Sequence, residues 1–203
     1  MNEKISADVR APESSTAFSV FEYLEMIVAC ACVIMLIFAI GIRICVVDGD
    51  SMNKTLENGD VLITNELFYE PSRGDIVVFH LQNEHYNQPL IKRVIATEGE
   101  WIDIKRSGNG LVVKIYAADD TDFSDPIIYE DEHAYYSSLN TGWTGLYDYP
   151  VQVPEGHVFV MGDNRWNSSD SRSEKVGFVD KRIIFGRAIC RVSPIDQLAF
   201  LID

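Results

Sequence analysis

Basic side chains are scarce in this sequence. Its 203 residues contain 17 Lys and Arg against 31 Asp and Glu, which gives a formal net charge of −14. So acidic a chain repels phosphate backbones, which argues against nucleic acid as a partner. Between Lys114 and Arg165 there is no Lys or Arg at all. We expect this acidic stretch to be a solvated insertion, with a docking surface as the sharper alternative.

Cysteine is also scarce, and its spacing fits no metal site. Cys30 and Cys32 lie inside an apolar run, Cys45 lies just beyond it, and Cys190 belongs to a later apolar segment. A Cys-Ala-Cys pair is too close for a usual zinc site. We expect four reduced thiols, while a Cys45–Cys190 bridge stays open. No metal and no cofactor is implied.

Only one long hydrophobic run is present, from Met26 to Ile42. Its 17 uncharged residues are at the lower limit for crossing a bilayer. A membrane anchor, a cleaved signal peptide and a buried core helix are the three alternatives. Glu22 and Glu25 precede the run, unlike the basic start of a signal peptide, so we favour the anchor. The predicted segments are a flexible tail (1–20), a transmembrane anchor (21–45) and a folded domain (46–203).

Beyond this run the sequence changes to short apolar or alternating segments separated by Gly, Pro, Asn and Asp. Such segments predict β-strands, and their regular spacing favours a mostly β domain of the open β-barrel type. The expected strands are 61–64, 75–79, 90–96, 101–105, 111–116, 157–161 and 183–192. A turn of helix is expected over 168–173.

One serine lies in the loop that joins the apolar run to the first expected strand. It belongs to Gly49-Asp50-Ser51-Met52, where a glycine lets the backbone bend sharply and leave amides free. Such a loop is ordinarily a surface turn. We predict instead that Ser51 is a nucleophile, which requires an adjacent base. The four histidines stand in no recognisable triad pattern.

Lys92 is the best candidate for that base. It lies in an otherwise apolar strand, with Leu90 and Val94 on its own face and Arg93 on the other. One of the two cations must therefore point toward the core or a cleft. Burial lowers the pKa of a lysine, and a neutral amine can take a serine proton. The alternative is an edge-strand lysine that reaches solvent.

A third segment, Gly162–Arg172, is almost entirely polar and follows an apolar strand. It offers hydroxyl groups that can orient an amine, and an Asp170/Arg172 pair that can hold the loop. Its acidic spacing is wrong for a calcium loop. A polar turn followed by a helix cap is the ordinary interpretation.

In combination, these segments resemble the bacterial type I signal peptidases. Four blocks carry the resemblance, in the family's order and behind an N-terminal span: Gly49–Leu56, Arg73–Phe79, Ile91–Val94 and Gly162–Arg172. The resemblance extends from the span to about Ile195. It implies a β-rich catalytic core with a smaller β-rich insertion, which we place at residues 106–153.

The resemblance also implies a role for each matching residue. Ser51 would be the acylating nucleophile, its backbone N–H an oxyanion donor, and Lys92 the general base. Ser168 would position the lysine amine, and Met52 would line the substrate cleft. Structural support would come from Asp163, Asn164, Asp170, Arg172 and Arg93.

The implied activity is removal of signal peptides from exported pre-proteins, with small residues preferred at −1 and −3. The enzyme would be a single-pass protein of the cell membrane with a cytoplasmic tail and an extracytoplasmic catalytic domain. Its partners would be signal peptides and the lipid bilayer, with the secretion translocon as a further candidate. Two rival classes are a self-cleaving Ser-Lys repressor-type protease and a non-catalytic anchored β-domain that binds partners.

Three positions within these blocks depart from the family pattern, and Thr97–Glu100 stands where Pro and Gly commonly follow the lysine strand. Gly49 stands where some members have a serine that donates to the oxyanion, Lys54 where proline is usual, and Trp166 where aspartate is usual. The indole of Trp166 would either contact membrane or substrate, or pack as a surface tryptophan.

Overall fold

The computed structural model describes residues 15–39, 41–67, 69–120, 122–129, 132–137 and 146–201. Contacts divide the chain into two compact units, Met1–Ile40 and Gly41–Asp203. Most of the expected tail and several acidic residues of the expected insertion, Glu130 and Asp131 among them, lie outside the described residues.

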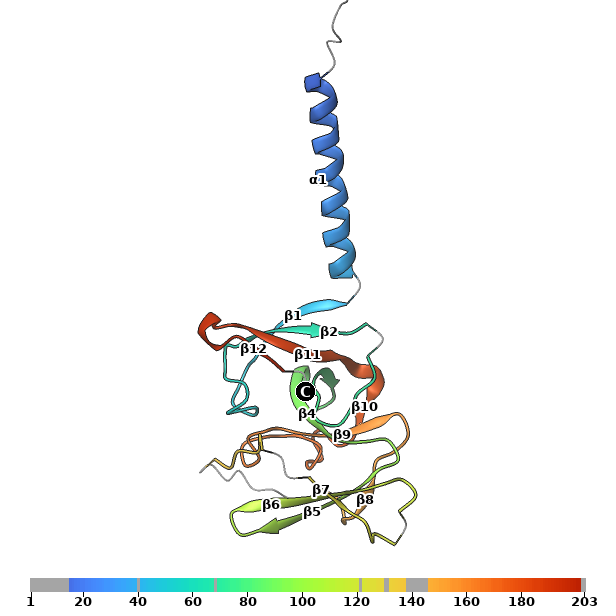
Figure 1. Cartoon of the computed structure of the whole chain (residues 1–203). Coiled ribbons are helices and arrows are strands. Elements are labelled where there is room, and N and C mark those ends of the chain that lie inside the picture. The colour runs from blue at the N-terminus through green and yellow to red at the C-terminus, as the bar shows by residue number, and fades with distance from the viewer. Residues whose placement is uncertain are drawn as a thin grey trace, which may run out of the picture. The chain divides into compact units, whose positions relative to one another are not determined.

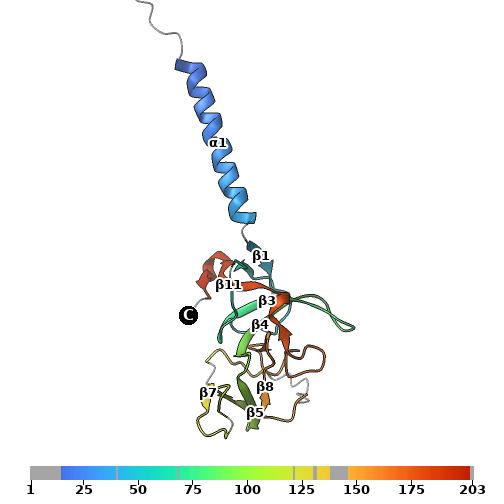
Figure 2. The same cartoon turned by 90° about the vertical axis from the view of Figure 1, so that its right-hand side faces the viewer.

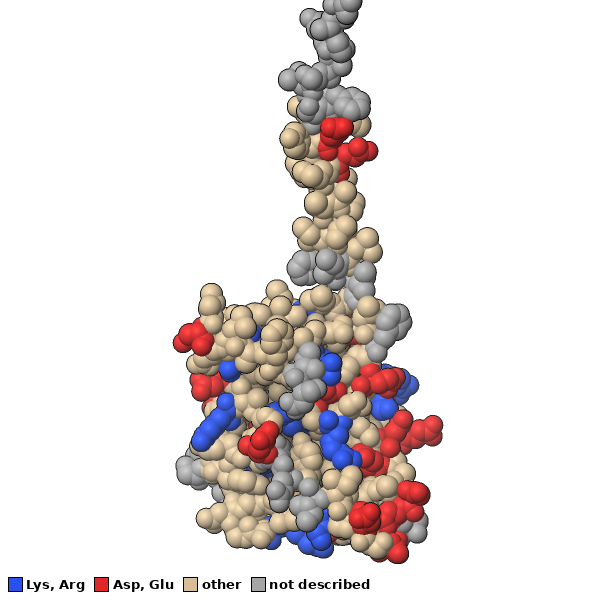
Figure 3. Space-filling model, viewed as in Figure 1, with Lys and Arg blue, Asp and Glu red and all other residues tan. Residues whose placement is uncertain are grey.

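The described part of the first unit is a single helix, α1, Ser15–Ala39. It begins inside the segment expected to be a tail and includes most of the apolar run. Its described side chains, at residues 20–36, are all exposed, and only Glu22 and Glu25 among them are charged (Figure 3). Within the described residues, no helix has both the length and the hydropathy required of a membrane-spanning candidate.

The second unit is built on a large antiparallel sheet. Its main path runs β1-β2-β11-β3-β4-β9-β10, and β12 pairs with β11 (Figure 1). The strands are β1 (Ile42–Val46), β2 (Val61–Asn65), β3 (Ile76–Gln82), β4 (Asn87–Thr97), β9 (His157–Met161), β10 (Val179–Asp180), β11 (Ile184–Ser193) and β12 (Ala199–Phe200). Two 3₁₀ turns, η1 (Lys181–Ile183) and η2 (Ile195–Gln197), flank β11.

A smaller sheet of order β7-β6-β5-β8 completes this unit. Its strands are β5 (Trp101–Ser107), β6 (Gly110–Tyr116), β7 (Ile127–Tyr129) and β8 (Val151–Gln152). Figures 1 and 2 show it at the end of the unit away from β1. Aliphatic side chains of both sheets share one core, in which Ile95 and Phe159 join Ile102, Ile104 and Ile115.

The prediction of a mostly β chain is confirmed, and all seven expected strands are present. The large sheet does not close into a barrel, since its path ends at β1 and β10 in the described part of the chain. Residues 42–45, assigned to the anchor, instead form β1. The small sheet begins at Trp101 rather than at residue 106.

Two further expectations meet different outcomes. Residues 168–173 form bends and turns instead of a turn of helix, because their side chains and amides bond to neighbouring strands and to one another. All four cysteines are free, as expected, so no Cys45–Cys190 bridge forms.

Gly186 shows how tightly β11 packs against β2. Strand β11 has a bulge between Ile184 and Gly186, and Gly186 has φ +141°. A Cβ atom there would overlap the backbone carbonyl of Asn65. A rigid strand cannot move aside as a flexible side chain could.

We therefore predict that Gly186→Ala lowers the free energy of unfolding by about 3 kcal/mol or more, because steric overlap adds to the cost of a positive φ. Gly59→Ala is the matched control: Gly59 has φ +93° but open space around its Cβ position. It should cost about 1–2 kcal/mol, the conformational term alone. Urea unfolding of both variants measures the difference, and equal losses would contradict the packing argument.

Candidate active site

Ser51 lies in a loop that is held from beneath by apolar side chains. Met52 and Leu56 are fully buried in a cluster with Leu62 and Ile91. The loop is closed by hydrogen bonds from the Leu56 amide to the Met52 carbonyl, 2.9 Å, and from the Gly49 amide to Oδ1 of Asn58, 2.9 Å. Burial of its neighbours therefore fixes the backbone that carries the half-buried Ser51.

The structure brings Ser51 and Lys92 into direct contact. Lys92 Nζ donates to Ser51 Oγ at 2.7 Å and to the backbone carbonyl of Ile91 at 2.8 Å. The two residues come from the loop after β1 and from β4. The same contact, with a neutral amine, lets the serine hydroxyl donate to Nζ. This is the geometry that a serine and its general base require.

The Lys92 amine is buried, with only 3% of the residue exposed. Loss of solvation lowers its pKa from 10.5 to about 8. The carboxylates of Asp170 and Asp163 oppose this shift, while the guanidinium of Arg172 contributes to it. A substantial fraction of Lys92 is therefore neutral at mildly alkaline pH.

Both faces of β4 are covered at this point. The alternation of the sequence required only one of Lys92 and Arg93 to be buried, yet each is 3% exposed. Arg93 lies on the opposite face and forms a two-pronged ion pair with Asp163, through Nε to Oδ1 at 2.9 Å and Nη2 to Oδ2 at 2.8 Å. Its Nη1 donates to the Gly74 carbonyl, 2.8 Å. The ion pair and the hydrogen bond together offset the cost of burying the Arg93 charge.

Asp163 and Asn164 connect two loops. One is the polar loop, residues 162–172, and the other is the serine loop, residues 47–60 between β1 and β2. The Asp163 carboxylate accepts a hydrogen bond from Thr55 Oγ1 at 2.6 Å. The Asn164 amide donates to the Ser51 carbonyl at 3.0 Å, and its side chain to the Asp50 carbonyl at 3.1 Å. The motif blocks imply a supporting role for Asp163 and Asn164, whereas nothing local in the sequence marks Thr55 as a long-range donor.

The Asp170–Arg172 pair lies in the interior of the polar loop. Arg172 donates to Asp170 through Nε at 2.8 Å and Nη2 at 2.7 Å. The Gly162 amide also donates to Oδ2 of this carboxylate, at 3.0 Å, the oxygen that accepts from Arg172 Nη2. Arg172 and these hydrogen bonds keep the pKa of Asp170 low against the opposing effect of burial. The pair is therefore ionised and folds the loop back on itself.

Position 162 has room only for glycine, because the backbone of Ser51 and the side chain of Ser168 lie close to its Cα atom. A Cβ atom at this position would be 2.5 Å from the Ser51 carbonyl oxygen and would overlap the Ser168 side chain. The absence of a side chain thus allows β9 to end directly against the serine loop. Three segments that are distant in sequence meet at this point.

Ser168 lies in this junction, but its hydroxyl is not bonded to the lysine. Its Oγ is buried and makes no hydrogen bond of normal geometry in the described part of the chain. It is close enough to Asp170 to help to lower the pKa of that carboxyl. The position of Ser168 suits a lysine-orienting group, whereas the hydrogen bond to Lys92 is not formed.

A pocket of about 360 Å³ opens beside the two residues. Its lining combines β1 and the loop that follows, residues 44–48, with residues 88–92 of β4, and ends at Ser51 and Met52. In the described residues, β1 pairs only with β2, and residues 87–92 pair only with β3. Both strands therefore present an unpaired backbone edge where they line the pocket.

Comparison with known proteins identifies the family of this chain. The family model described as "Signal peptidase, peptidase S26" matches residues 20–193. The chain belongs to this signal peptidase family. Its members remove signal peptides from pre-proteins, and the chain is accordingly a serine endopeptidase of the signal peptidase I type.

Two curated relatives give the same picture. The chain is 37% identical over 158 residues to "Probable signal peptidase I-1" of Synechocystis, which covers 73% of this chain and 69% of that protein. It is 31% identical over 186 residues to "Signal peptidase I" of Bacillus licheniformis, covering 89% and 92%. A crystal structure of a signal peptidase I from Enterococcus faecalis matches at 26% identity with a TM-score of 0.42, covering 59% of this chain and 97% of that chain.

Two of the departures from the signal peptidase pattern have a structural explanation. Trp166 is only 8% exposed, and its Nε1 donates to the Asn109 carbonyl at 3.2 Å. It packs between the Tyr136 ring and the Arg106 guanidinium. It therefore attaches the polar loop to the β5–β6 hairpin, and the interpretation as a membrane contact is not supported.

Lys54 is exposed and places its ammonium 4.7 Å from the ring centroid of Tyr135.

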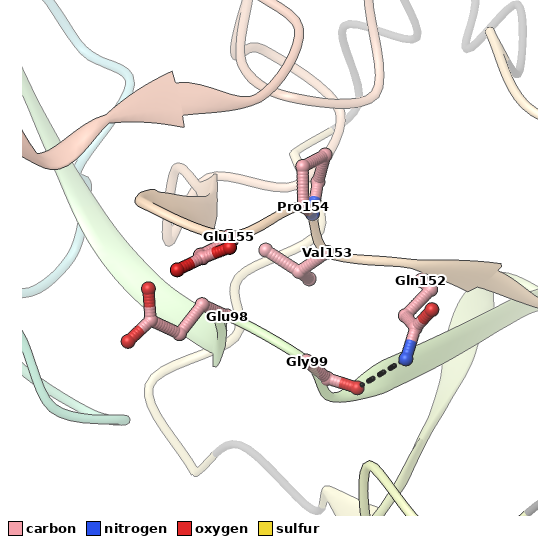
Figure 4. A pocket seen from close by; sticks show the side chains of 6 residues that line it. All are labelled: Glu98, Gly99, Gln152, Val153, Pro154 and Glu155. Atoms are coloured by element: carbon pink, nitrogen blue, oxygen red, sulfur yellow. Dashed lines mark hydrogen bonds between the residues drawn. The ribbon is translucent and has the colours of Figure 1, made fainter.

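A second hollow, of about 510 Å³, is lined by Glu98, Gly99, Gln152, Val153, Pro154 and Glu155 (Figure 4). Neither Ser51 nor Lys92 lines it. Glu98 already accepts from the Gly156 amide at 2.7 Å and from Lys181 at 3.0 Å. Gln152 donates to the Gly99 carbonyl. These polar groups are satisfied within the protein, so we assign this hollow no part in the peptidase site.

We predict that Asp163→Asn destabilises the protein by about 3–5 kcal/mol, because it removes the carboxylate that forms a two-pronged ion pair with the buried Arg93. Thermal unfolding measures the loss. Arg182→Gln is the control, since it removes an ion pair with Asp180 in which the Arg182 side chain is 88% exposed, and it should leave the unfolding midpoint unchanged. Equal effects of the two substitutions would show that burial of the Arg93–Asp163 pair is unimportant.

Proposed function

We propose that this signal peptidase cleaves with Ser51 as nucleophile and Lys92 as general base. The observation that carries the proposal is the 2.7 Å contact between Ser51 Oγ and the amine of a buried lysine whose pKa is about 8. Within the described residues, no histidine lies in hydrogen-bond contact with Ser51. A serine hydroxyl needs such a base near neutrality.

The proposed reaction begins when neutral Lys92 takes the Ser51 proton as Oγ attacks the scissile carbonyl. The Ser51 amide makes no hydrogen bond within the described chain, so it is free to donate to the developing oxyanion. Collapse of the tetrahedral intermediate transfers the Lys92 proton to the leaving amine. Water, deprotonated by the same lysine, then releases the signal peptide from the acyl-enzyme.

The pocket suggests how a peptide is held. An extended peptide entering between β1 and residues 88–92 of β4 can form backbone hydrogen bonds to either unpaired edge, as an added strand does. Alternate side chains would then face the pocket. Small residues at −1 and −3 fit this arrangement, because a pocket of limited size excludes larger side chains sterically. Buried Met52 forms part of the floor.

The remaining residues position Ser51 and Lys92, the catalytic dyad. The pairs Arg93–Asp163 and Asp170–Arg172 hold β4 and the polar loop against the serine loop, and Asn164 holds the Ser51 carbonyl. Ser168 would orient the amine once substrate fills the site. These are positioning roles, since none of these groups reaches the reacting atoms.

We also propose that residues 21–39 anchor the enzyme in the cell membrane, with the catalytic unit on the extracytoplasmic side. Support comes from the apolar, exposed side chains of α1 from Met26 to Leu36 and from the family's substrates, which cross this membrane. The lipid bilayer and the secretion translocon would then be its surroundings. Fractionation of cells that make the full chain, with protease added to intact cells, tests both points.

We predict that Ser51→Ala and Lys92→Met each reduce kcat on a pre-protein with an Ala-x-Ala site by about 10³-fold or more. Both variants should remain folded, and Lys92→Met should unfold no more easily than the wild type, because methionine has no amine to desolvate. Thermal unfolding verifies this. Wild-type rates in either folded variant would refute the dyad, and an inactive wild type would favour a non-catalytic binding protein.

The pH dependence provides a second test. Because the folded-state pKa of Lys92 is lowered to about 8, the neutral, competent form is gained as pH rises through 8. We expect kcat/KM to increase about tenfold per pH unit below 7 and to level off above 9. A profile flat from pH 6 to 10 would contradict a lysine base.

A further inference from the structure

One cation close to the nucleophile has no part in the mechanism above. Lys54 is exposed, three residues after Ser51, and no carboxylate within the described chain forms an ion pair with it. Its ammonium lies 4.7 Å from the centroid of the Tyr135 ring. Such a contact orients a lysine while leaving its charge available. In a chain of net charge −14, an unpaired cation at this place calls for an explanation.

The position of Tyr135 is fixed by the polar loop. Its amide donates to the Asp163 carbonyl at 2.7 Å, and its carbonyl accepts from the Arg165 amide at 2.7 Å. Asn164, between these two residues, donates to the Ser51 carbonyl at 3.0 Å. A continuous chain of backbone contacts therefore connects the nucleophile to the ring beneath Lys54.

Neither Lys54 nor Tyr135 is among the residues that line the pocket beside Ser51. The pocket is lined by residues 44–48 and 88–92 and ends at Ser51 and Met52, without Lys54 or Tyr135. Given the proposed function, the acyl portion of the substrate occupies the pocket. The residues that follow the scissile bond then lie outside the pocket, where Asn164, bonded to the Ser51 carbonyl, and Lys54 are neighbours of Ser51 that do not line it.

We propose that Lys54, held by Tyr135, is a specificity-determining residue that favours an acidic side chain among the first residues after the cleavage site. The inference rests on the proposed cleavage by Ser51. The attraction is that of an exposed charge pair, which corresponds to about a twofold to fivefold preference in rate. It weakens as ionic strength rises, because the pair is open to solvent.

The test uses the full-length protein in detergent and three pre-proteins that differ only at the second residue after the cut, which is Glu, Gln or Lys. Values of kcat/KM should rank Glu above Gln above Lys, with the difference mainly in KM. The Glu-to-Lys ratio should fall to near one in Lys54→Met, persist in Lys54→Arg, and shrink in Tyr135→Leu. About 0.5 M salt should also reduce the ratio in the wild type.

Lys175→Met is the matched control, because Lys175 is equally exposed and lies on a turn beside the β3–β4 hairpin; it should keep the wild-type ratio. A ratio of one in the wild type, or a ratio unchanged in Lys54→Met, would overturn the inference while the cleavage activity stands. Failure of the wild type to cleave any of the three substrates, or cleavage that survives in Ser51→Ala, would instead overturn the proposed function.

Discussion

The site depends on burial of the Lys92 amine beside the Ser51 hydroxyl. Lys92 loses its solvation where β4 is covered on both faces, and that loss lowers the pKa of its amine to about 8. A lysine in water would hold its proton and could not accept one from Ser51. The other elements of the site either exclude water from Lys92 or keep Ser51 at 2.7 Å from it.

Charged side chains surround Ser51 and Lys92, and each of these buried charges is compensated by a partner of opposite sign. Arg93 and Asp163 neutralise each other on one side of β4, and Asp170 and Arg172 do so within the polar loop. Each buried pair is two-pronged, so both oxygens of each carboxylate accept hydrogen bonds from the partner guanidinium, although Arg172 Nη1 makes none within the described residues. Gly162 adds the space that lets this loop contact the Ser51 carbonyl. The polar loop is thus a support for the dyad, built from ions because hydrocarbon could not bond to so many backbone groups.

Much of the fold could be predicted because its signals are local. Alternation and turn residues located seven strands, and the motif blocks located Ser51 and Lys92. Features that depend on distant neighbours were missed: β1 looked like an extension of the apolar run, and Trp166 looked exposed until the β5–β6 hairpin covered it. Alternation alone cannot reveal that Lys92 and Arg93 are both buried, since this requires knowledge of what packs on each face of β4.

Direct titration of the Lys92 amine is the most decisive measurement. The enzyme, labelled with ¹⁵N at lysine side chains, would be followed by NMR as a function of pH, with Lys92→Met identifying the signal. The account predicts deprotonation of Lys92 near pH 8, well below the ordinary lysine value of 10.5. A titration at 10.5 or above would contradict the account, because Lys92 would then remain an ammonium ion and could not serve as the base for Ser51.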